Sequence, residues 1–362
     1  MIEARQRRVL LIYSRVGGGH LSAARALAEA FETTGVVQPQ LVDAYLRCGR
    51  FPVTSFPKVY AQLARYHPIL WALLFHGSNQ RLDPKRVLGP FLRDGLRACI
   101  AEVQPEVVVS VLPVINGLIT EAAARTEVVL TDWHSVHRFW VARGIDHYTA
   151  PTDSARQDCI AYGAPANAVD VVGIPVRRGF ALAGEQRRER PANERFTILA
   201  MVGAEGSPRA LRALRALVRL RIDAQVTVVC GRNDQLRRQV QGLPARVPVQ
   251  ALGFVENIAE LMRGADVLVT KAGGLTLAEA FCCAVPVVVY DVLPGQESGN
   301  LQYALSHGAV AYARSPLRLA RLVAQLYADR GRRSVLAEKG RALARPNAAS
   351  DIVANVLRRL DD

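Results

Sequence analysis

The stretch from Val269 to Asn300 constrains the fold more strongly than any other part of this 362-residue chain. Together with the three residues before it, this stretch contains, in order, a β-branched and apolar run, a glycine turn, a helical pattern, a second apolar run and a polar loop: 266–270, 271–274, 275–283, 287–290 and 291–300. Strand, glycine turn, helix and strand in this order are typical of a parallel α/β unit. The glycine pair lets the backbone approach a ligand, and the helix start offers free N–H groups and a positive dipole end. We therefore expect an anion site here, suited to a diphosphate, with the polar loop beside it.

The same order of strand, glycine turn and helix is predicted at the start of the chain. An apolar run, 9–14, is followed by three glycines and His20, and then by an amphipathic helical pattern, 21–33. This second strand–glycine–helix unit is neither a GxGxxG dinucleotide loop nor a Walker loop. Because 362 residues exceed the size of one hydrophobic core, two α/β domains are expected.

Charge and cysteine content restrict the class of protein. The formal net charge of +14 is carried mostly by arginine and fits either a coding bias or an anionic partner, namely membrane lipid, nucleotide phosphate or nucleic acid. The six cysteines show no CxxC spacing, which indicates reduced core thiols in a cytosolic protein. The first apolar run lacks a signal-peptide cleavage region, and no run is long enough to span a bilayer. The sequence therefore predicts a soluble or peripheral globular protein.

The central stretch also resembles a known signature. Lys271-Ala-Gly-Gly-Leu-Thr-Leu-Ala-Glu279-Ala followed by PGQExxN at 294–300 is similar to the nucleotide-sugar motif of the monogalactosyldiacylglycerol synthases and the processive diacylglycerol glucosyltransferases. This group is related to the peptidoglycan GlcNAc transferase. Its other marks are matched by GGGH at 17–20, TDxxxHxxW at 131–140 and GIPV at 173–176. The resemblance implies the GT-B fold, in which two Rossmann-like lobes with parallel sheets face a cleft.

The resemblance and the composition together predict the domain boundaries. The segment 183–194 is charged, contains proline and shows no periodicity, so it is the best linker candidate. We expect an acceptor-binding lobe at 1–176, a linker at 177–194 and a nucleotide-sugar lobe at 195–345. A final helix at 346–362 would return to the first lobe, as in other transferases with two such lobes.

The resemblance implies a UDP-sugar as the donor. Glu279 would accept the ribose hydroxyls, the glycine turns would contact the diphosphate, and Gln296 and Asn300 would bind the sugar hydroxyls. The alternative for Glu279 is a solvent-exposed helix glutamate. The chain departs from the family at Ala204 and Pro208, where the family more often has another glycine. The residues expected to contact the donor are Gly18, Gly19, Gly203, Glu205, Gly253, Phe254, Val255, Gly273, Gly274, Leu275, Thr276, Glu279, Gln296 and Asn300.

The expected chemistry uses neither a metal nor a cofactor. The chain has no convincing Asp-x-Asp pair for a metal-bound diphosphate, so helix N-termini and positive charge would stabilise the leaving group. The reaction would be a direct displacement that inverts the anomeric carbon. His20 is the candidate general base, because the positive end of its helix disfavours the imidazolium form. A histidine that only contacts substrate is the alternative for His20, and Asp132 is the reserve base.

The segment from Phe51 to Phe75 concentrates aromatic residues in a chain with only 6% of them. One interpretation is a buried helix pair, and the other is an interfacial element with an apolar side and a basic side. The family resemblance favours the second, with contacts to the acceptor or the membrane. The residues assigned to these contacts are Lys58, Arg65, Trp71, Phe75 and, on the later loop, His137.

The sequence thus predicts an inverting hexosyltransferase from a UDP-sugar to a membrane lipid, with diacylglycerol as the first choice of acceptor. It would lie in the cytoplasm, peripherally on the inner face of an anionic membrane, and would bind no nucleic acid. Three alternatives stay open: a transferase for polyprenyl-pyrophosphate or another lipid, a nucleotide-sugar epimerase, and a non-catalytic basic module for membrane or RNA. The sequence does not decide between galactose and glucose, nor the oligomeric state.

Overall fold

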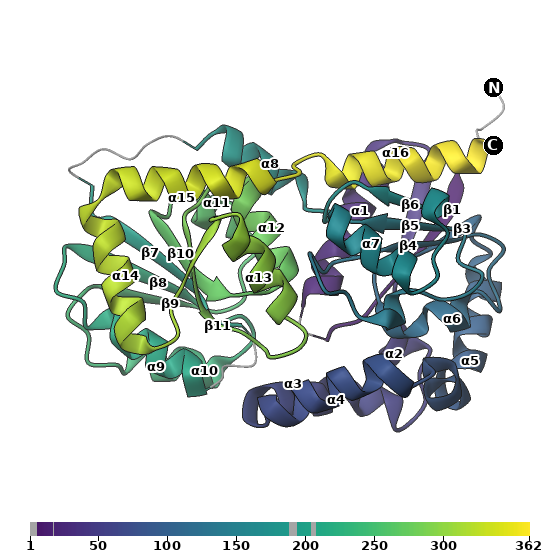
Figure 1. The fold of residues 1–362 in the computed structure, drawn as a ribbon, viewed down its shortest axis with the longest axis horizontal. Helices are drawn as coiled ribbons and strands as arrows, with labels where there is room; N and C mark the ends of the chain where they lie inside the picture. Colours follow the sequence, from purple (N-terminus) through teal and green to yellow (C-terminus); the bar gives the residue numbers. More distant parts are fainter. Residues whose placement is uncertain (1–5, 17, 188–193, 204–207) are drawn as a thin grey trace. The chain divides into compact units, whose positions relative to one another are not determined.

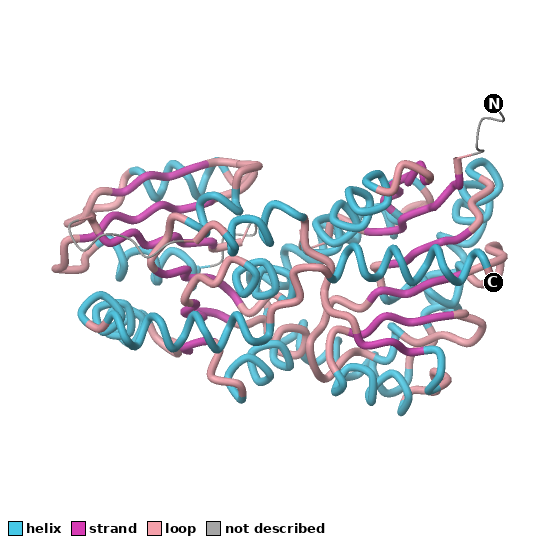
Figure 2. The backbone as a smooth tube through the Cα atoms, turned by 90° about the horizontal axis from the view of Figure 1, so that it is seen from above, coloured by secondary structure: helices cyan, strands magenta, loops and turns pink. Residues whose placement is uncertain are grey.

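The computed structural model describes residues 6–16, 18–187, 194–203 and 208–362. The chain forms two compact units (Figure 1). The first comprises Met1–Ala61, Leu70–Arg178 and Arg345–Asp362, and the second comprises Gln62–Ile69 and Gly179–Ala344. Each unit contains one parallel sheet of six strands. Figure 2 shows helices on both sides of the strands of each sheet.

The sheet of the first unit has the strand order β2-β1-β3-β4-β5-β6. Its central strands are runs of valine, leucine and isoleucine that are buried on both faces, as expected for a parallel sheet covered by helices. The chain order reverses between β1 and β3, which makes their carboxyl ends the topological switch point. The strands are β1 (Arg7–Tyr13), β2 (Val37–Asp43), β3 (Val107–Ser110), β4 (Thr126–Val129), β5 (His147–Ala150) and β6 (Val169–Val171).

Local capping fixes several helices of the first unit. The side chain of Asp43 accepts hydrogen bonds at the start of α2, Asp83 does so at α5, and Thr152 at α7, as the sequence predicts for Thr152. The last helix, α16, packs against α1. The helices that carry residues of the first unit are α1 (Gly19–Thr33), α2 (Ala44–Arg47), η1 (Val53–Ser55), α3 (Phe56–Tyr66), α4 (Pro68–Arg81), α5 (Pro84–Val103), η2 (Pro113–Ile115), α6 (Asn116–Ile119), η3 (Arg138–Trp140), α7 (Asp153–Ala161), η4 (Ala166–Ala168) and α16 (Ala348–Asp361).

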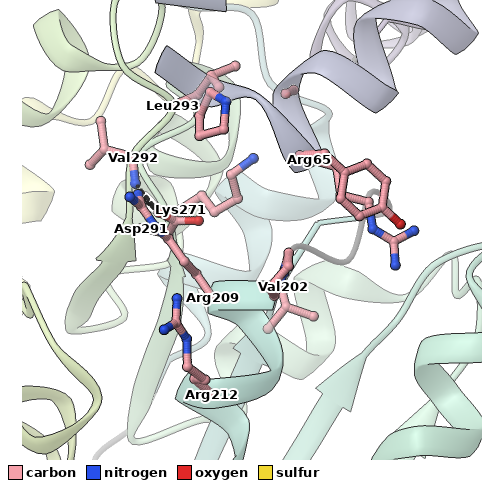
Figure 3. Close-up of a pocket in the computed structure, with 12 residues that line it drawn as sticks. Arg65, Val202, Arg209, Arg212, Lys271, Asp291, Val292 and Leu293 are labelled. Atoms are coloured by element: carbon pink, nitrogen blue, oxygen red, sulfur yellow. Dashed lines mark hydrogen bonds and ion pairs between the residues drawn. The ribbon is translucent and has the colours of Figure 1, made fainter. Parts of the chain in front are cut away.

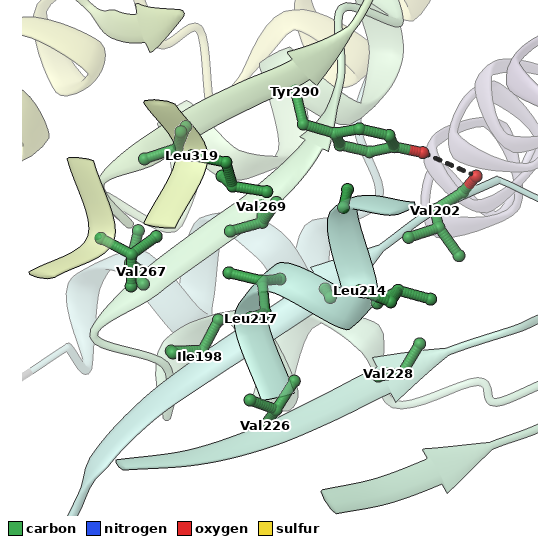
Figure 4. Close-up of a cluster of buried hydrophobic side chains, with 14 of the residues drawn as sticks. Ile198, Val202, Leu214, Leu217, Val226, Val228, Val267, Val269, Tyr290 and Leu319 are labelled. Atoms are coloured by element: carbon green, nitrogen blue, oxygen red, sulfur yellow. Dashed lines mark hydrogen bonds between the residues drawn. The ribbon is translucent and has the colours of Figure 1, made fainter. Parts of the chain in front are cut away.

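The sheet of the second unit has the order β12-β11-β10-β7-β8-β9, with its switch point between β7 and β10. Figure 4 shows the core on one face of this sheet, where Ile198, Val226 and Val267 of the strands meet Leu214 and Leu217 of a covering helix. The strands are β7 (Phe196–Met201), β8 (Ala224–Val229), β9 (Val249–Leu252), β10 (Val267–Lys271), β11 (Val287–Asp291) and β12 (Val310–Tyr312). The helices are α8 (Arg178–Glu185), α9 (Pro208–Val218), α10 (Asp234–Gln241), α11 (Ile258–Arg263), α12 (Gly274–Cys282), α13 (Ser298–Ser306), α14 (Pro316–Ala328) and α15 (Arg330–Leu343).

The predicted strand, glycine turn, helix and strand between 266 and 290 form, and the two-lobe α/β architecture is confirmed. All six cysteines are buried, as expected for core residues. Helix α6 ends at Ile119, where the chain turns with the amides of Ala122 and Ala123 both bonded to the Ile119 carbonyl. The end of the expected polar loop 291–300 is also helical, which places Asn300 on α13.

The segment predicted as a linker, 177–194, contains helix α8. Phe180 and Ala183 of this helix are buried, and the Phe180 carbonyl accepts a hydrogen bond from the Cys283 thiol at 3.6 Å. Residues 178–185 therefore pack into the second unit, because they supply apolar side chains to its core. Residues 188–193 lie outside the described part of the chain.

Candidate active site

The first unit presents His20 at its switch point. The loop after β1 leads to Gly18, which adopts a left-handed conformation (φ 75°) that glycine enters without strain, and α1 begins at Gly19. His20 is the second residue of this helix. The glycines therefore deliver an imidazole to the sheet edge where open α/β folds bind ligands.

The His20 ring is half-buried, but its Nδ1 atom is buried and has no hydrogen-bond partner among the described residues. Burial lowers the pKa of His20 from 6.5 to about 4, so the ring is neutral at physiological pH. The edge of the ring meets Trp140, with ring centroids 6.3 Å apart and planes at 69°. A buried nitrogen without a hydrogen-bond partner costs free energy unless a ligand supplies that partner. His20 is thus a neutral imidazole with an unpartnered buried nitrogen at the carboxyl end of β1.

Trp140 connects His20 to Asp132. The indole Nε1 of Trp140 donates to Asp132 Oδ2 at 3.0 Å, and the Trp140 carbonyl accepts from Asn116 Nδ2 at 2.9 Å. The Ser110 hydroxyl in turn donates to Asn116 Oδ1 at 2.7 Å. This chain of buried hydrogen bonds fixes the indole against which His20 packs. Sequence reasoning missed Ser110 and Asn116, because neither belongs to a motif and Asn116 is 24 positions from its partner Trp140.

The His137 side chain contacts helix α4 and does not point into solvent. Its Nδ1 accepts from the Phe139 amide at 3.2 Å, so the proton lies on Nε2, which is 3.1 Å from both the Phe75 carbonyl and the Ser78 hydroxyl. Burial lowers the pKa of His137 to about 4, which keeps the ring neutral. His137, which the sequence assigns to acceptor or membrane contact, therefore lies in a buried contact that orients α4.

Helix α4 turns its aromatic residues inward. Trp71 packs edge-on against Tyr60 with ring centroids 4.8 Å apart, and Phe75 packs against His137 at 4.7 Å. The large side chains that α4 exposes are aliphatic: Leu73 is 66% exposed and Leu74 is 50% exposed. Trp71 and Phe75, which the sequence assigns to acceptor or membrane contacts, are thus half-buried, with rings against Tyr60 and His137.

The two predicted basic contacts of this region differ in their surroundings. Lys58 on α3 is exposed, as expected of a surface cation. Arg65 instead lines a pocket of the second unit, and its Nε is buried without a hydrogen-bond partner among the described residues. Its guanidinium lies 4.9 Å from the centre of the Tyr66 ring.

The second unit places the central motif at its own switch point. β10 ends at Lys271, Gly273 is the N-cap of α12, and the helix begins at Gly274. Four predicted diphosphate contacts, Gly273 to Thr276, therefore form the first turn of α12, where amide N–H groups point out of the helix. The start of α12 thus lies directly after β10, the strand that pairs with β7 at the switch point.

Glu279 and Asn300 are buried, as are the predicted donor contacts Gly274 and Leu275. Glu279 is buried on α12, which excludes the solvent-exposed alternative. Asn300 is buried on α13, and its Nδ2 donates to the Ala272 carbonyl at 3.3 Å. Asn300 therefore supports the glycine turn directly. Gln296, four residues earlier, is half-buried next to Gly295, which has φ 84°.

The remaining donor predictions lie on loops that follow β7 and β9. Gly203 has φ 77°, and the Gly253–Val255 turn exposes Phe254, over whose ring Arg232 stacks at 5.2 Å. Glu205 lies outside the described residues. The Phe254 ring with its arginine is a surface on which a planar base could stack.

A pocket of about 190 Å³ opens at the carboxyl ends of β7, β10 and β11 (Figure 3). Val202 follows β7, Lys271 ends β10 and Asp291 ends β11, and all three line it. Its charged lining is mainly cationic and consists of Arg65, Arg209, Arg212, Lys271 and Asp291. Sequence reasoning missed Arg209 and Arg212, because arginine is frequent throughout the chain.

Two family profiles match this chain, and each covers most of one of its two units. The profile of the monogalactosyldiacylglycerol (MGDG) synthase family matches residues 20–176, and that of the glycosyl transferases group 1 matches residues 184–343. The processive diacylglycerol beta-glucosyltransferase of Bacillus cytotoxicus is 30% identical over 366 residues, which cover 97% of this chain and 93% of that protein. This chain belongs to the diacylglycerol glycosyltransferase family. The chloroplastic MGDG synthase of Spinacia oleracea is 28% identical over 96% of this chain and 71% of its own length.

Solved structures agree with this family at the level of the fold. The MurG structure from Acinetobacter baumannii has a TM-score of 0.66 at 17% identity, with 97% of this chain and 99% of that chain covered. The HepE structure from Anabaena in complex with UDP and glucose has a TM-score of 0.59 at 14% identity, with 98% and 100% covered. This diacylglycerol glycosyltransferase family member therefore has the GT-B fold. In the described part of the chain, no helix is both long and apolar enough to cross a bilayer.

Proposed function

We propose that this protein transfers a hexose from a UDP-sugar to the hydroxyl of diacylglycerol and inverts the anomeric carbon. The observation that carries this proposal is similarity along nearly the whole chain to proteins named as diacylglycerol glycosyltransferases, at 28–30% identity over 96–97% of its length. Both units contribute a glycine turn at a switch point, so acceptor chemistry on the first and donor binding on the second fit the observed folds.

His20 is the proposed general base. The acceptor oxygen attacks the anomeric carbon as its proton passes to His20 Nδ1, and the bond from that carbon to the diphosphate oxygen breaks to release UDP. A neutral imidazole with a pKa of about 4 is unprotonated throughout the physiological range, and its buried Nδ1 gains the partner that it lacks. Asp132 stays the alternative base, although its Oδ2 already holds Trp140.

The donor is proposed to lie along α12. Amides of the first helical turn would bind the diphosphate, Glu279 the ribose hydroxyls, and Gln296 the sugar. Asn300 would act on the sugar and on the glycine turn, whose Ala272 carbonyl it holds. No metal or cofactor enters this proposal, because backbone amides and side-chain cations supply the positive charge that the leaving UDP requires.

The acceptor requires a bilayer surface, and α4 is the proposed contact. Leu70, Leu73 and Leu74 are exposed apolar side chains on this helix, and Lys58 adds an exposed cation on α3. The net charge of +14 favours an anionic surface. These features support a peripheral location on the inner face of the cell membrane, where cytoplasmic UDP-sugar and lipid would meet.

The test is transfer itself. Purified protein would be incubated with UDP-glucose or UDP-galactose and anionic vesicles that contain diacylglycerol, and the lipid extract would be analysed for glycosylated diacylglycerol. His20→Ala serves as the matched inactive variant. Release of free hexose without glycolipid, or interconversion of the UDP-sugar, would contradict the proposed acceptor and favour a hydrolase or an epimerase.

A further inference from the structure

Two carboxylates, the buried Asp291 and the half-buried Glu297, hold two cations that line the pocket of the second unit. Asp291 Oδ1 accepts from the Val292 amide and from Arg209 Nη1, both at 3.0 Å. Glu297 Oε2 accepts from the Leu293 amide at 2.7 Å, while its Oε1 lies 3.7 Å from Lys271 Nζ. The same loop thus anchors both carboxylates to consecutive backbone amides. Figure 3 shows Arg209 extending to Asp291 at the end of β11.

Burial distinguishes the carboxylates from the cations. The Asp291 and Glu297 side chains are only 9% and 13% exposed, whereas those of Lys271 and Arg209 are 21% and 54% exposed. A guanidinium has five N–H donors, and Asp291 engages one nitrogen of Arg209. The carboxylates therefore restrict two long cationic side chains and still leave them accessible from the pocket. This is the arrangement expected of a preorganised anion site.

We propose that Arg209 and Lys271 bind the diphosphate of the nucleotide-sugar, and that Asp291 and Glu297 are positioning residues for them. This inference rests on the proposed function and adds residues to its donor site. Both cations line the pocket at the switch point, and Lys271 precedes the first residue of α12 by three positions. The helix start and the two cations therefore act on one anion. A phosphate of a lipid headgroup has the same chemistry and is the competing source.

The two cations have a role in the proposed transfer reaction. When the bond between the anomeric carbon and the diphosphate oxygen breaks, that oxygen keeps the electron pair, so UDP gains negative charge. Arg209 and Lys271 would offset this charge as a divalent metal does in other transferases, without changing protonation state. Their pairing with Asp291 and Glu297 means that little side-chain reorganisation is needed when the ligand arrives.

The experiment compares ligands that differ only in phosphate. UDP, UMP and uridine would be titrated by calorimetry into the full chain and into Arg209→Gln and Lys271→Gln. The control is Arg215→Gln, which removes the same charge from an exposed position of α9 that does not line the pocket. Loss of a charged hydrogen bond to UDP should weaken its binding by roughly ten-fold or more, while uridine affinity changes by less than about two-fold. Thermal melting checks that each variant is folded.

A double-mutant cycle tests the positioning role. If Asp291 acts through Arg209, the ten-fold effect of Arg209→Gln should shrink to within about two-fold in an Asp291→Asn background. A purely structural role for Asp291 would change the melting temperature and leave the UDP-to-uridine affinity ratio unchanged. An undiminished effect of Arg209→Gln would overturn the positioning role.

The outcomes separate this inference from the proposed function. If the wild type binds UDP and both pocket variants behave like Arg215→Gln, the assignment of Arg209 and Lys271 is overturned while the transferase proposal stands. If the wild type binds no UDP, the proposed donor is wrong as well. Vesicles of phosphatidylglycerol form the second arm: a loss of vesicle binding with unchanged UDP affinity would assign the pocket to a lipid phosphate and overturn the inference.

Discussion

The burial of His20 Nδ1 makes a quantitative prediction about acid pH. Because burial lowers the pKa of His20 to about 4, about 97% of the rings stay unprotonated at pH 5.5, compared with about 9% for a histidine at its usual value of 6.5. A base must be unprotonated to act, so kcat/KM should be nearly constant from pH 7.5 to pH 5.5 and fall only near pH 4. His20→Ala should lower turnover by roughly a hundred-fold or more at all these pH values.

The assay is glycolipid formation at fixed UDP-sugar and vesicle composition across this pH range, with donor affinity measured separately by calorimetry. His20→Ala should keep the donor affinity, because the residue lies on the first unit and is assigned to the acceptor. A decline of about ten-fold between pH 7.5 and pH 5.5, with a midpoint near 6.5, would refute the reasoning about the buried nitrogen. A His20→Ala turnover within a few-fold of wild type would transfer the role of base to Asp132 or to another group.

Three further predictions concern the donor, the membrane and stability. Glu279→Ala should weaken the binding of UDP itself in calorimetry, and unchanged affinity would remove the ribose assignment. Leu73→Ser with Leu74→Ser should reduce binding to anionic vesicles in a co-sedimentation assay and leave the urea midpoint unchanged, because both side chains are exposed; normal vesicle binding would argue against α4 as the contact. Arg359→Ala should lower the free energy of unfolding by about 3–5 kcal/mol, because it leaves the buried Glu127 carboxylate without its two charged hydrogen bonds. A loss below about 1 kcal/mol in urea unfolding would show that α16 is not held by this pair.

The parts of the fold that local sequence determines could be predicted. The strand–glycine–helix units at His20 and at Lys271 depend on neighbouring residues: apolar runs for the strands, glycine for the turns, and helical periodicity after them. Two such units in a long chain with alternating strands and helices are enough to predict a parallel α/β architecture. The cap of α7 by Thr152 is local in the same way.

The orientation of α4 could not be predicted, because the helix carries apolar residues on all of its sides. Trp71 and Phe75 compete with Leu73 and Leu74 for the buried side, and no periodic pattern distinguishes the two sets. The structure decides through contacts distant in sequence, such as that of Phe75 with His137. Aromatic content alone therefore does not show which side chains of α4 are most exposed.

The cation pocket was missed for a related reason. Arg209 and Asp291 are 82 positions apart, and only the strand order β11-β10-β7 brings their strand ends together. Neither residue belongs to a motif that a sequence pattern would select. The support of Trp140 by Asn116 has the same origin, since it depends on the contact between η3 and α6.

The most direct test of the central claim is the stoichiometry of the transfer reaction. With diacylglycerol in anionic vesicles and an excess of chelator, each molecule of UDP released from UDP-glucose or UDP-galactose should be matched by one molecule of glycosylated diacylglycerol. The anomeric configuration of that product, read by proton magnetic resonance, should be opposite to that of the donor. UDP release without glycolipid, or a glycolipid with retained configuration, would contradict the assignment as an inverting, metal-independent diacylglycerol glycosyltransferase.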